Sequence, residues 1–300
     1  MQKLVCILIM GMLSSNLIAC DVCSCSGSTN NFGILPSFTR HFVGIKYQFK
    51  SFHSSPHKLN DIHYGPSDET FHSTELWGRM IIKKRLQVFG SIPYNINKRI
   101  EQHKTTLIHG IGDMNLMLSY VLIEPTNNQS TWQHSLQAGV GVKLPTGKSK
   151  QLQDNILLNQ NIQLGSGSID IPMNVMYTIR HKNLGYNTEF NYKFNTQNKM
   201  GYQFGNRFNA TSRIFLQKKT TLFTFIPHTG INLEYAFQDK RNSIKEDYTG
   251  GHFLFANAGI DTYYKKIALT LFLQQPLGGH YGEGHIASQT RFASSLILLF

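Results

Sequence analysis

The sequence predicts an all-β fold in which about twelve amphipathic strands form a closed transmembrane antiparallel β-barrel. Three observations predict it: apolar and polar residues alternate along long segments, turn residues separate these segments, and the final segment is itself an apolar strand. Successive side chains of a strand point to opposite faces of the sheet, so the alternation gives each strand one apolar and one polar face. In a transmembrane barrel the apolar faces meet lipid and the polar faces line the interior.

The final strand, residues 291–300, has one mostly apolar face formed by Phe292, Leu296, Leu298 and Phe300. A terminal strand frays unless it is tied down, so we expect it to pair with another strand. The terminal Phe preceded by alternating apolar residues resembles the closing-strand signal of outer-membrane β-barrels, which the barrel-assembly machinery reads. The resemblance implies that this strand closes the ring, and that this machinery and outer-membrane lipids are partners of the chain.

The composition narrows the class of protein. The 300 residues carry a formal net charge of +12, but Lys and Arg are scattered, whereas nucleic-acid-binding proteins gather them on one face. We therefore expect no nucleic-acid partner. After the first twenty residues no apolar run approaches the roughly 18 residues of a membrane helix, which excludes a helical membrane protein. The 20 Phe, 13 Tyr and 25 Gly suit a transmembrane barrel.

Residues 1–19 predict a secretory signal peptide, because Lys3 precedes an apolar segment over 4–13. The stretch LIAC, residues 17–20, resembles a lipobox, in which cleavage before Cys20 leaves a thiol that carries lipid; the alternative is ordinary cleavage nearby with Cys20 free. Residues 20–38 predict a tether rich in Cys, Ser and Gly. Cys23 and Cys25, with Cys20 if it is free, are candidate ligands for Cu(I) or Zn(II), and the alternative is an inert or oxidised tether.

Residues 39–300 predict the barrel, since alternation with period two, bounded by turn residues, continues throughout. A soluble β-sandwich would also alternate, but its strands are usually shorter than the roughly 9–11 residues needed to cross a membrane. The twelve predicted strands cover 43–50, 71–82, 86–96, 114–122, 132–144, 169–179, 184–194, 202–216, 221–237, 253–264, 267–277 and 291–300.

The connections between the predicted strands alternate between short turns and longer loops, as transmembrane barrels require. An even number of strands leaves both termini on the same side, the periplasmic side of an outer membrane. The longer loops are residues 54–70, 97–112, 145–168, 238–251 and 278–285, with a brief loop at 196–201. Aromatic residues near strand ends predict the two interfacial girdles. They are Phe52, Tyr94, Trp132, Tyr186, Phe194, Tyr202, Phe237, Tyr263 and Tyr264.

The polar faces carry charged residues that we expect inside the barrel, because a Lys or Arg at the lipid midplane costs about 2–4 kcal/mol. Two interpretations remain open: ion pairs that close the interior, or a narrow, mildly anion-favouring passage for small polar solutes, since rings of one charge sign tune selectivity. The candidate lumen-lining residues are Lys46, Lys50, Glu75, Arg79, Asp113, Lys143, Asp170, Arg180, Glu189, Lys193, Arg207, Arg213, Glu234, Asp261 and Arg291.

The sequence predicts no enzyme and no cofactor. His and Ser are adjacent in sequence at His53-Ser54, His72-Ser73 and His134-Ser135. Neighbouring residues in a strand point to opposite faces, so these pairs do not make the nucleophile–base contact that covalent catalysis requires.

Two glycine-containing motifs carry a family resemblance. Residues 110–113 (GIGD), which enter a strand, and residues 139–148 (GVGVKLPTGK), which leave one, are similar to motifs of uncharacterised outer-membrane transporter barrels, a group that includes the barrels of the meta-pathway of phenol degradation. Residues 33–36 and 51–53 resemble a subgroup named only "transporter family". The resemblance implies a passive channel for small solutes and supplies no catalytic residue. The alternative is a closed barrel that acts as a metal-binding or structural outer-membrane protein.

Overall fold

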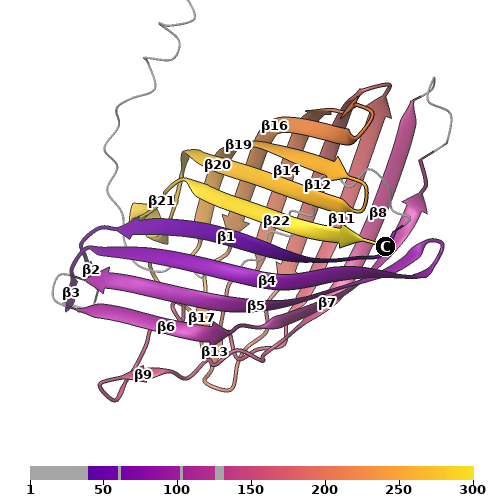
Figure 1. Cartoon of the computed structure of the whole chain (residues 1–300). Helices are drawn as coiled ribbons and strands as arrows, with labels where there is room; N and C mark the ends of the chain where they lie inside the picture. The colour runs from indigo at the N-terminus through magenta and orange to yellow at the C-terminus, as the bar shows by residue number, and fades with distance from the viewer. Residues whose placement is uncertain (1–39, 60–61, 102–103, 126–131) are drawn as a thin grey trace, which may run out of the picture.

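The computed structural model describes residues 40–59, 62–101, 104–125 and 132–300, and over these ranges the chain is a closed antiparallel β-barrel (Figure 1). The predicted fold class is confirmed. The predicted signal peptide, the tether, Cys20, Cys23 and Cys25 lie outside the described residues. In the described ranges, twelve strands form the barrel wall: β1 (Phe42–Ser54), β4 (Ser67–Lys83), β5 (Leu86–Glu101), β7 (Met114–Ile123), β8 (Gln133–Leu144), β11 (Ile171–His181), β12 (Leu184–Phe194), β14 (Arg207–Leu216), β16 (Phe223–Ala236), β19 (Gly251–Tyr264), β20 (Ile267–Tyr281) and β22 (Arg291–Leu299).

The ring closes between β22 and β1, as the apolar final strand predicts. Their register runs from Phe42 opposite Leu299 to Phe49 opposite Phe292, and β22 also pairs with β20 on its other edge. Beyond the ladder, the Phe300 N–H donates to the His41 carbonyl at 3.0 Å, and the two rings stack with centroids 5.7 Å apart. The final strand is therefore paired along both edges.

The alternation of the sequence separates an apolar outer surface from a polar interior. On β1, Val43 and Ile45 are 41% and 56% exposed, whereas Phe42 and Lys46 are 2% and 5% exposed. The same contrast recurs around the ring, for example between Leu118 and Ser119 of β7. This follows from the two-residue period of a strand. Soluble monomers rarely expose so continuous an apolar surface.

The two ends of the barrel differ. Tight connections such as residues 84–85, 182–183 and 265–266 lie at one end, which we call the turn end, together with Phe300 (Figure 1). The opposite, loop end carries the longer connections and short strands: β2 (His57–Leu59), β3 (Ile62–Tyr64), β9 (Leu152–Gln153), β10 (Ile156–Leu157), β13 (Tyr202–Gln203), β17 (Lys240–Arg241), β18 (Ile244–Lys245) and β21 (Ile286–Ser288), with β15 (Lys218–Lys219) at the turn end. No helix in the described ranges has the length and apolar character needed to span a membrane.

The segment predicted as a loop over 97–112 is instead a strand hairpin. β5 continues to Glu101 and pairs with β6 (Thr105–Ile111). The alternation continues in β6, where Leu107 and Ile111 are exposed and Ile108 is buried, so this segment has the pattern of a strand. Gly112 and Asp113 separate β6 from β7, and Gly110 near the end of β6 has a φ of +148°, which favours glycine.

The predicted strand 202–216 begins at Arg207. Tyr202 and Gln203 form β13, which pairs with β17 in a separate small sheet. The Tyr202 hydroxyl donates to Asp239 at 2.5 Å, and the Gly205 N–H donates to the other oxygen of this carboxylate at 2.7 Å. Burial raises the pKa of Asp239, and burial and this carboxylate together raise the pKa of Tyr202. Tyr202 therefore belongs to the loop cluster.

The predicted aromatic girdles are only partly correct. Tyr94, Trp132, Phe194 and Phe237 are exposed on the outer surface, but Phe52, Tyr202 and Tyr263 are buried inside. Phe52 and Tyr263 occupy inward positions of β1 and β19, so proximity to a strand end does not decide which face an aromatic residue takes.

Candidate functional site: the charged interior

The interior carries most of the charged side chains of the wall strands as ion pairs. Lys46 and Glu75 are register partners on β1 and β4 and form a buried ion pair. Arg213 and Glu189, both 1% exposed, are 3.3 Å apart, and the Arg291–Glu234 distance is 2.8 Å. Lys46 on β1 and Glu189 on β12 lie on opposite sides of the ring, so buried ion pairs occupy both sides of the interior.

The two glycine-containing motifs of the sequence meet at one buried group, which we call the Asp113 cluster: Asp113, Lys143, Ser166, Ser168 and Asp170. Lys143 Nζ lies 2.7 Å from a carboxylate oxygen of Asp113 and 2.7 Å from one of Asp170. Asp113 also accepts the N–H groups of Ser166 at 2.8 Å and Gly147 at 3.0 Å, and the Ser166 hydroxyl at 2.9 Å. The two motifs are therefore joined through the Asp113 cluster. Their spacing in the sequence gives no indication that they meet.

Close backbone contacts explain why glycine occupies two positions beside the Asp113 cluster. A Cβ atom on Gly147 would lie 2.7 Å from the Leu164 carbonyl oxygen, and one on Gly165 would lie 2.6 Å from the Gly147 carbonyl oxygen. Contacts this short exclude any larger residue without a backbone shift. Residue 147 therefore has to be glycine for the loop to pack here.

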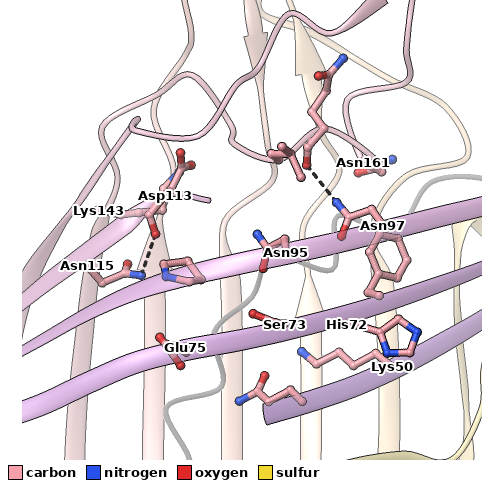
Figure 2. A pocket seen from close by; sticks show the side chains of 15 residues that line it. Lys50, His72, Ser73, Glu75, Asn95, Asn97, Asp113, Asn115, Lys143 and Asn161 are labelled. Carbon is pink, nitrogen blue, oxygen red and sulfur yellow. Dashed lines mark hydrogen bonds and ion pairs between the residues drawn. The ribbon is translucent and has the colours of Figure 1, made fainter. Parts of the chain in front are cut away.

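The connection between β8 and β11, residues 145–170, folds into the loop end of the bore. Asn97 Nδ2 donates to the Ile162 carbonyl at 2.8 Å, and Ile162 and Leu164 pack on Ile108. Beneath this segment lies a cavity of about 80 Å³ lined by Lys50, Glu75, Asn97 and Asn161 among others; Figure 2 shows Asn161 above Asn97, with Glu75 and Lys50 on the strands below. The loop therefore narrows the interior from the loop end.

The turn end of the bore has an apolar layer, whereas the sequence predicts that polar strand faces line the interior. It covers the inner wall from β14 through β22 and β1 to β7, whereas β8, β11 and β12 contribute polar groups such as Gln137 and Asn187. The Phe42 and Trp77 rings meet edge to face, with centroids 4.6 Å apart. Near the turns, both faces of several strands are apolar, so alternation alone does not reveal this layer. It consists of Phe42, Trp77, Phe89, Met117, Phe215, Ile226, Tyr263, Ala268, Ile297 and Leu299.

Arg79 lies within the apolar layer and not in a charged ring. It is 2% exposed, donates to the Arg40 carbonyl at 2.7 and 3.1 Å, and its guanidinium lies 5.2 Å from the centroid of the Phe42 ring. Arg180 is closer to the turn end and donates to Gln133 and Gln217. Asp261 accepts the Thr270 hydroxyl at 2.7 Å and lies 3.8 Å from His228.

The remaining predicted lumen residues, Lys50, Lys193 and Arg207, lie on the loop-end half of the interior face. Lys50 lines the 80 Å³ cavity. Lys193 on β12 and Arg207 on β14 are register partners. Sequence reasoning missed Arg99, which pairs with Glu69 at 3.2 Å and Glu101 at 2.7 Å, because it fell in a segment predicted as a loop.

The Thr146 side chain connects the two motifs, and its replacement tests how much this connection stabilises the protein. The Thr146 hydroxyl donates to the Gly112 carbonyl at 2.8 Å and accepts the Met114 N–H at 2.9 Å. We expect Thr146→Val to lower the free energy of unfolding by about 1–3 kcal/mol, because these backbone groups lose a partner. Denaturant unfolding measures this; Thr221→Val, at an exposed turn position, is the control. Equal stability of both variants would contradict a bridging role for Thr146.

The comparisons with known proteins support the fold. A search of family models and a search of curated proteins found no match. Among solved structures, the chain is similar to the COG4313 outer membrane channel from Pseudomonas putida F1, with a TM-score of 0.64, 12% identity, and coverage of 90% of this chain and 98% of that one. It is also similar to the β domain of the Bordetella autotransporter BrkA, with a TM-score of 0.54, 9% identity, and coverage of 87% and 99%.

The chain has the fold of an outer-membrane β-barrel. The predicted relation to the meta-pathway barrels is not tested by these comparisons and stays a prediction. Within the described residues, no three His, Cys, Asp or Glu side chains form a group that could hold a metal ion. The candidate site is therefore the interior itself, which consists of the Asp113 cluster, the ion pairs below it and the apolar layer at the turn end.

Proposed function

We propose that this chain is an outer-membrane protein that forms a passive channel for small polar solutes. The observation that supports this most is the charged interior, with ion pairs and amides on inward positions from the loop end to the apolar layer. A barrel with a purely structural role gains little from such groups, because apolar replacements for buried ion pairs are often neutral or stabilising. The fold likeness to a solved outer membrane channel agrees with the proposal. The channel involves no cofactor and no chemical step.

We propose the same orientation as the sequence suggests, with both termini in the periplasm and the loop end outside. Cys20 then carries the lipid anchor after removal of residues 1–19, and the barrel-assembly machinery reads the final strand. The motif resemblance extends the proposal to the transporter group that includes the meta-pathway barrels. The solute itself stays open within the class of small polar molecules.

The membrane location can be tested on the outer surface. Leu118 is 46% exposed in the middle of β7, and Ile244 is 74% exposed on a loop hairpin. If the outer surface meets lipid, Leu118→Arg lowers the free energy of unfolding from bilayers by about 2–4 kcal/mol, because a charge is placed in hydrocarbon. Ile244→Arg should leave it unchanged. Equal effects on unfolding from vesicles would contradict a lipid-facing β7.

The transport activity can be tested by electrical recording. Because the inward loop and the apolar layer narrow the bore, we expect purified protein in planar bilayers to give small, discrete conductance steps. Vesicles that contain the protein should release small polar tracers and retain large ones. A barrel that is electrically silent and excludes every tracer would overturn the proposal.

The apolar layer favours a second candidate, a closed structural barrel. In that case the ion pairs serve to fix the interior, and no variant of an interior residue conducts. A metal-binding role of the tether belongs to the same alternative. Stoichiometric Cu or Zn binding that disappears in the Cys23→Ser, Cys25→Ser double variant would support it, and failure to retain either metal would remove it.

A further inference from the structure

Two neighbouring cations on the interior face have no hydrogen-bond or ion-pair partner among the residues that the structure describes. Lys193 and Arg207 are directly opposite each other on β12 and β14. Among the described residues neither forms a hydrogen bond or an ion pair, and the Nε atom of Arg207 is enclosed without an acceptor. Like charges directly opposite on a sheet destabilise it, so an anion bound between the two side chains would stabilise this arrangement.

The neighbouring positions of the sheet do not supply this compensation. In the same row, Lys193 lies opposite Pro172 on β11, and Arg207 lies opposite Ala236 on β16. One step deeper, the row consists of Asn191 and Asn209, whose amide groups donate to Glu189 at 3.0 Å and to Asn232 at 2.8 Å. The positions directly beside the two cations in this row, and the two amides one step deeper, are therefore uncharged.

The carboxylates nearest to the two cations are already bound by other groups of the protein. Asp113 and Asp170 share Lys143, and Glu234 is paired with Arg291. Asp239 is held by the Tyr202 hydroxyl and the Gly205 N–H. Opposite charge therefore reaches Lys193 and Arg207 only from carboxylates that other groups of the protein already bind.

Both side chains are also accessible. Lys193 and Arg207 are partly exposed, unlike the fully buried Arg213–Glu189 pair deeper in the bore. An Arg guanidinium binds the two oxygens of a carboxylate or phosphate group side by side, and an adjacent Lys supplies a point charge to the same group.

We propose that Lys193 and Arg207 form a binding site for the oxyanion group of a small solute, a carboxylate or a phosphate. The site deepens the proposed channel function, on which its transport role rests, by assigning anionic solutes as the preferred cargo. The solute enters from the loop end and is held by both cations before it reaches the apolar layer.

Binding is tested first without any electrical measurement. Full-length protein in detergent is titrated with inorganic phosphate or acetate at constant ionic strength, and its thermal unfolding midpoint is recorded. The wild type should be stabilised by the oxyanion and not by chloride. In the double variant Lys193→Gln, Arg207→Gln, the apparent affinity for the oxyanion should fall on the order of tenfold or more, since charge-assisted hydrogen bonds are lost. The Arg207→Lys variant should also bind the oxyanion more weakly. The double variant Lys218→Gln, Lys219→Gln, at the turn end, should bind it as the wild type does. The stronger of the two ligands identifies the oxyanion class.

Selectivity is tested second, by reversal potentials under a salt gradient. The wild type should favour anions, and the Lys193→Gln, Arg207→Gln variant should lose this preference while it still conducts. If the protein binds phosphate or acetate but never conducts, the channel function fails and the site stands. If it conducts but neither oxyanion stabilises it, or the variants bind and select as the wild type does, the site is overturned. The gel mobility of unheated samples confirms that each variant is a folded barrel.

Discussion

Replacement of Asp113 by Ala should lower the free energy of unfolding by about 3–5 kcal/mol, because it removes one partner of a buried ion pair. Lys143 would keep Asp170 as its only carboxylate partner, and the N–H groups of Ser166 and Gly147 would lose their acceptor. The same change should release residues 145–170 from the loop end. We therefore expect the Asp113→Ala barrel to have a larger conductance and to be cleaved by protease within this loop.

Asp154→Ala is the matched control for this prediction. Asp154 belongs to the same connection, but its ion pair with Lys104 lies on the surface. Surface ion pairs contribute about 0–1 kcal/mol, so stability and conductance should hardly change. If the two variants behave alike in denaturant unfolding and bilayer recordings, the Asp113 cluster does not hold the loop in the bore.

Replacement of Trp77 by Ala should widen the turn end of the bore. Trp77 is 4% exposed and packs edge to face on Phe42 within the apolar layer. Truncation of a buried Trp costs about 3–5 kcal/mol, and it removes side-chain volume from the constriction. A hydrophobic constriction limits flow because it loses water, so a wider one should conduct more.

The other tryptophan provides the control for the Trp77 prediction. Trp132 is 59% exposed on the outer surface and contacts His181. Trp132→Ala should leave the conductance of the open channel unchanged. The measurement is single-channel conductance at constant salt, with unheated gel mobility as the test of folding. Equal conductance in Trp77→Ala and the wild type would show that the apolar layer does not limit flow.

The sequence predicts the faces of the strands well and their contacts poorly. Residues 184–194 alternate regularly, and β12 has these bounds. Alternation also indicates that Lys143 and Asp113 point inward, but it does not reveal that they meet, because pairing depends on the register of the whole ring. Near the turns the pattern fails for Phe42 and Trp77, since apolar residues occupy both faces there. The prediction that Tyr202 belongs to the wall strand is wrong for another reason. Its hydroxyl donates to the buried Asp239, and its backbone pairs with β17 in a different sheet.

The pairing of β22 with β1 has a consequence for how the molecule is made. Until these strands meet, the sheet has two free edges whose backbone groups can pair with those of another chain. The contact joins segments from opposite ends of the described sequence, so it is among the most costly in chain entropy to form. Until β22 pairs with β1, the incomplete barrel therefore has to be kept from pairing with other chains during biosynthesis.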